Sequence, residues 1–142
     1  MKPLLFSVLL SFVSSASLAQ KDSTAFHAYI YSQEYDVFLN IDLYKQDITV
    51  PGQELYGQLP GYLGKQNNTF CWVITTAKIK NDHVAELSLI NDYGSEDLTV
   101  QLTQKNDSTY ILRQLEGSSL KVPKNGRWQK LPKSFELKRM KR

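Results

Sequence analysis

The amino-acid sequence predicts an all-β protein, an antiparallel meander of eight or nine strands closed into a small up-and-down barrel. Apolar and polar residues alternate with a period of two through most of the chain, and no long segment has a helical period. Short turn signals separate the alternating segments at a spacing of about 8–12 residues. A β-sandwich is the alternative, but a closed barrel is preferred because closure removes the exposed sheet edges.

The composition is that of one globular domain. The chain has 142 residues, of which 42% are hydrophobic and 22% are charged, so a disordered or fibrous protein is excluded. A single cysteine excludes a disulfide framework and any zinc site built from several thiolates. Residues 20–142 are therefore expected to form a single β-barrel domain.

Residues 1–19 predict a signal peptide. Lys2 precedes the apolar run Leu4 to Val13, and Ser17-Leu18-Ala19 fits the small-x-small cleavage rule, with a cut after Ala16 as the alternative. The apolar run is too short for the roughly 20 residues that span a bilayer. The sequence thus predicts a periplasmic or secreted protein without a membrane span.

The first half of the domain contains four predicted strands, at 26–31, 37–43, 53–59 and 70–79. In the first two, every second residue is apolar, which predicts one buried and one solvated face. The third is bounded by Pro-Gly pairs on both sides. The fourth is apolar on both faces at its start, so it is expected to be buried on both sides, with Cys71 as a buried and inert thiol.

The second half contains shorter segments separated by regular turn signals. Strands are expected within 84–90, 98–103, 110–115, 120–122 and 135–140. Asn125-Gly126 predicts a two-residue hairpin turn because both residues tolerate positive φ. A single helical turn is compatible with the sequence near Thr24 or Ser95, and nothing longer is supported.

Charge is divided unevenly along the chain. Residues 20–120 contain seven basic and thirteen acidic side chains, whereas residues 121–142 contain nine basic side chains and one acid, Glu136. Such asymmetry can mark a segment that binds nucleic acid, anionic lipid or an acidic polymer. The preferred interpretation is an edge strand around Phe135 whose lysines oppose strand addition. Nucleic acid is disfavoured because no aromatic–basic recognition motif is present.

The sequence contains no motif for catalysis. His27 and His83 are the two histidines, and neither lies in a metalloprotease or triad-type motif. We therefore expect a protein that is not an enzyme, with no catalytic residues and no cofactor.

The densest polar cluster is Asn91–Asp97, whose acids and glycine could bind calcium. Its spacing does not fit the calcium-loop template, which requires acids at alternate positions and a glutamate at the twelfth. A tight turn between two strands, with Asp92 and Ser95 bonded to nearby backbone amides, explains the same residues. The turn is preferred, so no metal site is predicted.

Candidate binding residues come from the segment 56–64, which combines three glycines with Tyr56 and Tyr62. Close backbone approach at a bend would leave these rings exposed, and together with Tyr93 they could line the mouth of a barrel. The acids Glu96 and Asp97 complete this candidate surface. The alternative, equally open, is a barrel corner whose aromatic side chains fill the core.

The chain from Trp72 onward resembles small exported bacterial calycin-like β-domains, many of them uncharacterised. The resemblance is carried by a tryptophan-bearing strand, the short alternating strands after it, and the ending Trp128-Gln129-Lys130-Leu131-Pro132-Lys133-Ser134-Phe135-Glu136-Leu137. It implies an antiparallel calycin-like barrel. Some small exported barrels inhibit lysozymes or neutralise delivered toxins, although no residue here matches an inhibitor motif.

Two functions follow as expectations. The first is an exported, non-enzymatic binding protein with a protein partner in the cell envelope, inhibitor- or immunity-like. The alternative is a lipocalin-like carrier of a small apolar ligand. Inward-pointing Trp72, Phe38 and Leu102 would favour the first, whereas an internal cavity of about 300 Å³ would favour the carrier. The oligomeric state is left open.

Overall fold

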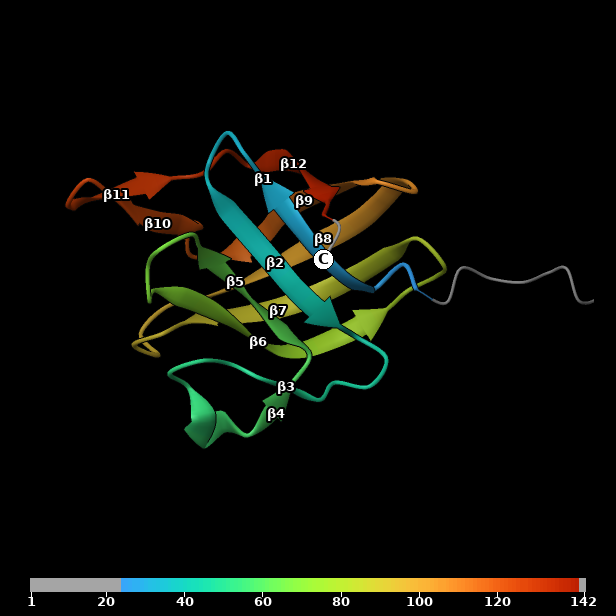
Figure 1. Cartoon of the computed structure of the whole chain (residues 1–142), viewed down its shortest axis with the longest axis horizontal. Helices are drawn as coiled ribbons and strands as arrows, with labels where there is room; N and C mark the ends of the chain where they lie inside the picture. Colours follow the sequence, from blue (N-terminus) through green and yellow to red (C-terminus); the bar gives the residue numbers. More distant parts are fainter. Residues whose placement is uncertain (1–23, 141–142) are drawn as a thin grey trace, which may run out of the picture.

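The computed structural model describes residues 24–140, which form a closed barrel of eight antiparallel strands (Figure 1). The hydrogen-bonded order around the barrel is β1-β12-β9-β8-β7-β6-β5-β2. The strands are β1 (His27–Ser32), β2 (Val37–Asp42), β5 (Gly61–Lys65), β6 (Cys71–Ile79), β7 (Val84–Asn91), β8 (Asp97–Asn106), β9 (Thr109–Gly117) and β12 (Ser134–Arg139). The predicted all-β, up-and-down barrel is confirmed, and the β-sandwich alternative is wrong.

The predicted signal peptide, residues 1–19, lies outside the described residues. Within residues 24–140, no helix has the length and apolar character needed to cross a bilayer.

Two excursions lie outside the barrel and explain why the described chain has more strands than expected. The connection between β2 and β5 contains β3 (Ile48–Thr49), the 3₁₀ turn η2 (Glu54–Tyr56) and β4 (Gln58–Leu59). The connection between β9 and β12 contains the hairpin of β10 (Lys121–Lys124) and β11 (Arg127–Lys130), which projects from the barrel in Figure 1.

The strand predicted over 53–59 is wrong except at its end, where Gln58–Leu59 forms β4. Gly57 has a φ of +76° and ends the 3₁₀ turn, and the side chain of Leu55 is fully exposed. The only described helical turn is therefore here and not at Thr24 or Ser95. The hairpin predicted at Asn125-Gly126 is confirmed, because both residues have positive φ, 51° and 76°, as a type I′ turn requires.

The interior of the barrel is filled by side chains from the inward-facing positions of its strands. Alternation places Val37, Leu39 and Ile41 of β2 inside, and the other strands follow the same pattern. The largest fully buried side chains are Trp72, Tyr110, Phe26, Ile30, Leu39, Ile41, Leu63, Ile74, Leu87, Leu89, Leu102 and Leu112. Trp72 and Leu102 thus point inward, whereas Phe38 lies on the outer face because it stands between two inward-facing neighbours of β2.

Strand β6 is buried on both faces at its start, as predicted. Trp72 and Ile74 join the barrel interior, while Cys71 and Val73 pack with Val50 in a second, smaller cluster. Val50 belongs to the β2–β5 connection, so this excursion covers the outer face of β6. Cys71 is a buried free thiol.

The β10–β11 hairpin is anchored to the barrel by buried side chains and two polar links. Leu120, Val122 and Leu131 belong to the main core. The indole N–H of Trp72 donates to the Lys121 carbonyl oxygen at 2.9 Å. Gln114 on β9 accepts from the Leu120 amide at 2.8 Å and donates to the Pro132 carbonyl oxygen at 3.0 Å, so it ties both ends of the hairpin to the barrel.

Strands β1 and β12 close the barrel. Their register pairs only Ile30 with Arg139 and Tyr31 with Lys138. On its other side β12 pairs with β9 over five residues. The prediction of an edge strand around Phe135 is therefore wrong, because closure provides β12 with a neighbour on each side.

We expect Gly61→Ala to destabilise the fold strongly. Gly61 has a φ of +152°, and a Cβ there would collide with the Asn40 carbonyl oxygen and lie 2.9 Å from the Ile41 Cα, both backbone atoms of β2. The free energy of unfolding should fall by roughly 3 kcal/mol in chemical denaturation. Gly52→Ala is the matched control, since Gly52 also has positive φ but open space around it; its cost should be about 1 kcal/mol. Equal losses in the two variants would contradict this packing argument.

Candidate binding site

Three aromatic rings form a strip across the outer face of β1, β2 and β5. The rings of Tyr29 and Phe38 stack with centroids 5.1 Å apart, and the rings of Phe38 and Tyr62 meet edge-to-face at 5.6 Å. The register pairs Tyr29 and Tyr62 with Asn40, so Phe38 lies diagonally from both, and diagonal neighbours are within reach of aromatic side chains. All three side chains are half-buried.

Gly64 makes room for the central ring of this strip. It stands directly opposite Phe38 in the β2–β5 register, and a Cβ at this position would lie 2.5 Å from the Phe38 Cζ. The absence of a side chain at Gly64 therefore lets the Phe38 ring lie across β5.

A groove of about 440 Å³ lies beside the strip, bounded by the β2–β5 connection. We call it the aromatic groove. It is lined by Phe38, Pro51, Gly52, Gln53, Tyr62, Gly64, Asn68, Thr69, Phe70, Cys71 and Asp92. A shallower hollow, lined by Tyr29, Phe38 and residues 65–69, adjoins it. Phe38, Asn68 and Thr69 border both, so the two form one surface with aromatic rings and amide and hydroxyl groups within it.

Asp92 supplies the groove with a carboxyl group in an unfavourable environment. Its Oδ1 atom is buried and has no hydrogen-bond partner among the described residues. Burial raises the pKa of Asp92, while hydrogen bonds from the backbone at Cys71 and Asp92 oppose that rise. The wall of the groove therefore contains a carboxyl oxygen that is closed off from solvent and has no donor among the described residues.

Cys71 lies in the same groove but is not poised for nucleophilic chemistry. Burial raises the pKa of its thiol to about 11, and the nearby charge of Asp92 adds to the effect. A thiol of this pKa remains protonated near neutral pH and is a poor nucleophile. The groove therefore favours binding over covalent chemistry.

Phe70 connects the aromatic groove with the β10–β11 hairpin. Its ring meets that of Trp128 edge-to-face, with centroids 5.1 Å apart. The Lys121 ammonium lies 6.0 Å from the Trp128 ring centroid and 3.1 Å from a carboxylate oxygen of Glu96. Glu96 is thus connected to the groove residue Phe70 through the side chains of Lys121 and Trp128.

The five predicted binding residues are distributed over several surfaces. Tyr62 lines the aromatic groove, on the outer face of the barrel. Tyr56 lies in η2, 42% exposed, and Tyr93 lies in the β7–β8 turn, 78% exposed; neither lines that groove. Glu96 does not line the groove and pairs with Lys121 of the hairpin, and Asp97 lines a different hollow.

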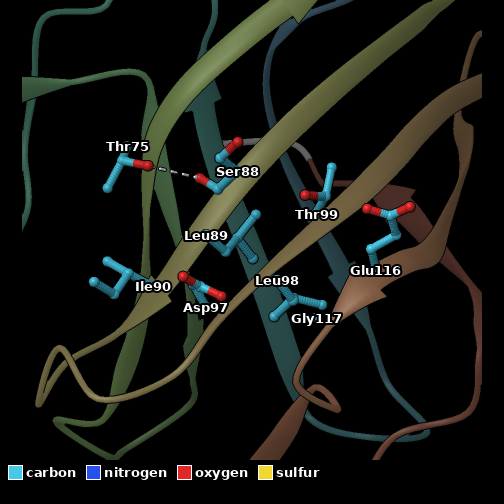
Figure 2. A pocket seen from close by; sticks show the side chains of 9 residues that line it. All are labelled: Thr75, Ser88, Leu89, Ile90, Asp97, Leu98, Thr99, Glu116 and Gly117. Carbon is cyan, nitrogen blue, oxygen red and sulfur yellow. Dashed lines mark hydrogen bonds between the residues drawn. The ribbon is translucent and has the colours of Figure 1, made fainter.

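Asp97 lines a polar hollow of about 370 Å³ across β6 to β9 (Figure 2). A bulge at Thr75 in β6 and another at Leu115 in β9, opposite Thr99 and Val100, interrupt the strand register on its two sides. Glu116 and Ser88 contribute further polar groups, and the Thr75 hydroxyl donates to the Ser88 carbonyl oxygen at 3.2 Å. This hollow is separate from the aromatic groove and has no aromatic lining.

The segment Asn91–Asp97 is a tight turn, as predicted, but the side chain that spans the turn is not one of the two that were predicted. Asn91, and not Asp92, organises it, because the Asn91 Oδ1 accepts from the backbone amides of Ser95 at 2.9 Å and Glu96 at 3.3 Å. Asn91 is buried at the end of β7 and can therefore hold the turn from inside. Across residues 24–140, no three His, Cys, Asp or Glu side chains are grouped so that they could hold a metal ion.

Neither histidine contributes to the aromatic groove. His27 Nε2 lies 3.8 Å from an Asp42 carboxylate oxygen, and His83 Nδ1 lies 3.3 Å from the Gln104 Oε1. His27 lies at the start of β1 and His83 lies directly before β7, so both contacts are at strand ends.

Sequence reasoning missed Phe38, Phe70 and Asp92 as groove residues. The signal for Phe38 was present, because it is an aromatic residue at a position that alternation assigns to the outer face of β2. Phe70 and Asp92 approach the groove only through the pairing of β6 with β7.

No family model, curated protein or solved structure matches this chain. The resemblance to calycin-like exported domains therefore stays a prediction, while the barrel architecture rests on the strand pairing itself.

We expect Asp92→Asn to stabilise the fold near neutral pH. A carboxyl group whose pKa is raised on folding stabilises the native state only while it is protonated, and this contribution is lost as the pH rises through the folded-state pKa. Asparagine keeps an acceptor without the buried charge, so the melting temperature should rise by a few degrees at neutral pH. The gain should disappear below the ordinary Asp pKa of about 3.9, where both states are protonated.

Thermal unfolding followed by circular dichroism at neutral and acid pH measures this difference. Asp107→Asn is the control, because Asp107 is exposed in the β8–β9 turn. A melting temperature of Asp92→Asn below that of the wild type at neutral pH would contradict the assignment of an uncompensated buried carboxylate.

Proposed function

We propose that this chain is an exported, non-enzymatic binding protein that holds a protein partner in the aromatic groove. The observation that carries the proposal is the half-exposed strip of Tyr29, Phe38 and Tyr62 beside a groove of about 440 Å³ on the outside of the barrel. Tyrosine and other aromatic side chains bury large areas with little loss of conformational entropy, and they are frequent anchors at protein interfaces.

The packing of the barrel supports an outer binding surface over an internal one. Trp72, Tyr110 and Leu102 are completely buried among the inward-facing side chains. An apolar ligand of the lipocalin type would have to take the volume that these side chains occupy. The carrier function is therefore the less supported alternative.

The polar groups of the groove indicate what the partner would offer. Asp92 provides a buried acceptor without a partner among the described residues, and Asn68, Thr69 and Gln53 border the same groove. A partner that packs an apolar side chain against Phe38 and hydrogen-bonds to the exposed side chains of Asn68 and Thr69 would match the apolar and the polar part of the groove. We propose that this partner is a protein of the cell envelope, which the chain inhibits or neutralises.

Residues 1–19 support the proposal that the chain is exported. Their basic start, apolar run and small-residue end are those of a secretory signal. An exported chain would meet its partner in the periplasm or outside the cell, and this is where we propose that it acts.

Capture from envelope extracts tests the groove. A protein retained by the immobilised wild type should bind Tyr62→Ala and Phe38→Ala at least about tenfold more weakly, because each substitution removes an aromatic anchor. Tyr56→Ala and Tyr93→Ala are matched controls, since both rings are exposed and neither lines the groove. Affinities can be measured by biolayer interferometry once the captured protein is purified.

Loss of capture in the control variants with retention in Tyr62→Ala would place the interface elsewhere and overturn the proposal. Native mass spectrometry of the purified chain provides an independent check. A stoichiometric lipid in that spectrum would favour the carrier function instead.

A further inference from the structure

The β10–β11 hairpin carries only basic charges. Its charged residues are Lys121, Lys124, Arg127 and Lys130, and it contains no acidic residue. It forms its own two-stranded sheet and projects from the barrel at the upper left of Figure 1. A concentration of positive charge is thus displayed on an element outside the barrel.

The register of the hairpin brings these like charges together. Lys121 stands directly opposite Lys130, and Lys124 stands directly opposite Arg127. Like charges opposite each other across an antiparallel pair are destabilising. Stability of the hairpin alone does not account for this arrangement, whereas an anionic ligand would relieve the repulsion.

Most of these cations lack an acidic partner in the described residues. Lys121 pairs with Glu96 at 3.1 Å. No acidic side chain of residues 24–140 lies within ion-pairing distance of Lys124, Arg127 or Lys130, all of which are exposed.

Of the two acids that share a hollow with the hairpin tip, Asp36 is held by other groups. Glu34 and Asp36 line a hollow between the β1–β2 turn and the hairpin. Asp36 accepts from the Tyr31 hydroxyl at 2.7 Å and lies 3.9 Å from the Lys65 ammonium. The positive charge at the hairpin tip is therefore only partly balanced from within the chain.

Trp128 adds an amphipathic ring to the same surface. Pro123 pairs with Trp128, so the Trp128 side chain lies on the hairpin face that also carries Lys121 and Lys130. The indole is 53% exposed, with the Lys121 ammonium 6.0 Å from its centroid. Exposed tryptophan flanked by lysine and arginine is the composition that favours the headgroup region of a bilayer.

We propose that the β10–β11 hairpin docks this protein on an anionic lipid surface. An array of anionic headgroups complements the unpaired cations without requiring a fixed shape, and the Trp128 ring can enter the headgroup region beside Lys130, with Lys124 and Arg127 at the adjacent turn. The uneven charge of the chain supports this orientation, because residues 20–120 are net acidic and would face away from the bilayer. The inference is independent of the partner in the aromatic groove.

Vesicle binding tests the proposal on the purified full chain. The probes are vesicles of phosphatidylglycerol mixed with phosphatidylcholine and vesicles of phosphatidylcholine alone, used at low salt and at physiological salt. The wild type should partition onto the anionic vesicles and do so less at the higher salt. The triple variant Lys124→Gln, Arg127→Gln, Lys130→Gln should lose about two orders of magnitude in partition coefficient, at about fivefold per charge.

The control has the same change in charge on another part of the barrel. Lys45→Gln, Lys78→Gln, Lys80→Gln should bind the anionic vesicles nearly as well as the wild type, since these lysines lie outside the hairpin. All variants keep residues 1–19, so any membrane affinity of that segment is the same in each.

Tryptophan fluorescence gives a second readout. Trp72 is completely buried, so a blue shift on vesicle binding reports Trp128, and Trp128→Phe should abolish it. Equal binding of wild type and triple variant, or equal binding to neutral and anionic vesicles, would overturn the proposal. Binding of a polyglutamate peptide through the hairpin without vesicle binding would also overturn it, in favour of an acidic protein.

Discussion

Most inward positions of the barrel strands are apolar, and their side chains must fit one another because the closed sheet shields them from solvent. Trp72 shows how strict the constraint is: its one polar atom is satisfied only by the Lys121 carbonyl oxygen of the covering hairpin. Because side chains fill the interior, the outer face and the two excursions are the parts of the structure that can form a binding surface.

Both proposed surfaces belong to those outer parts, and they are neighbours. The aromatic groove lies between the β2–β5 connection and the outer face of β5, and Phe70 links it to Trp128 on the hairpin. A protein partner in the groove would therefore sit close to a bilayer held by the hairpin. Such an arrangement suits a protein that acts on targets arriving at an envelope membrane.

The barrel could be predicted from the sequence because its strands obey a single local rule. Alternation identified the inward residues of β1, β2, β7 and β8, and Asn125-Gly126 identified a turn that depends only on its own φ angles. Local rules failed at 53–59, where Pro and Gly punctuate an excursion, and at β12, whose second neighbour is the first strand of the barrel. The groove was equally hidden, since Phe38, Phe70 and Asp92 meet only through pairing between distant strands.

The short seam between β1 and β12 has a consequence for biosynthesis. It joins Ile30 to Arg139, so a nascent chain that emerges N-terminus first keeps one edge of β1 without its neighbour until residue 139 has been added. At ribosomal rates this interval lasts roughly ten seconds. An unpaired strand edge attracts other strands for all of that time. Chaperone protection of β1 during synthesis would therefore determine how much of the chain reaches the closed barrel.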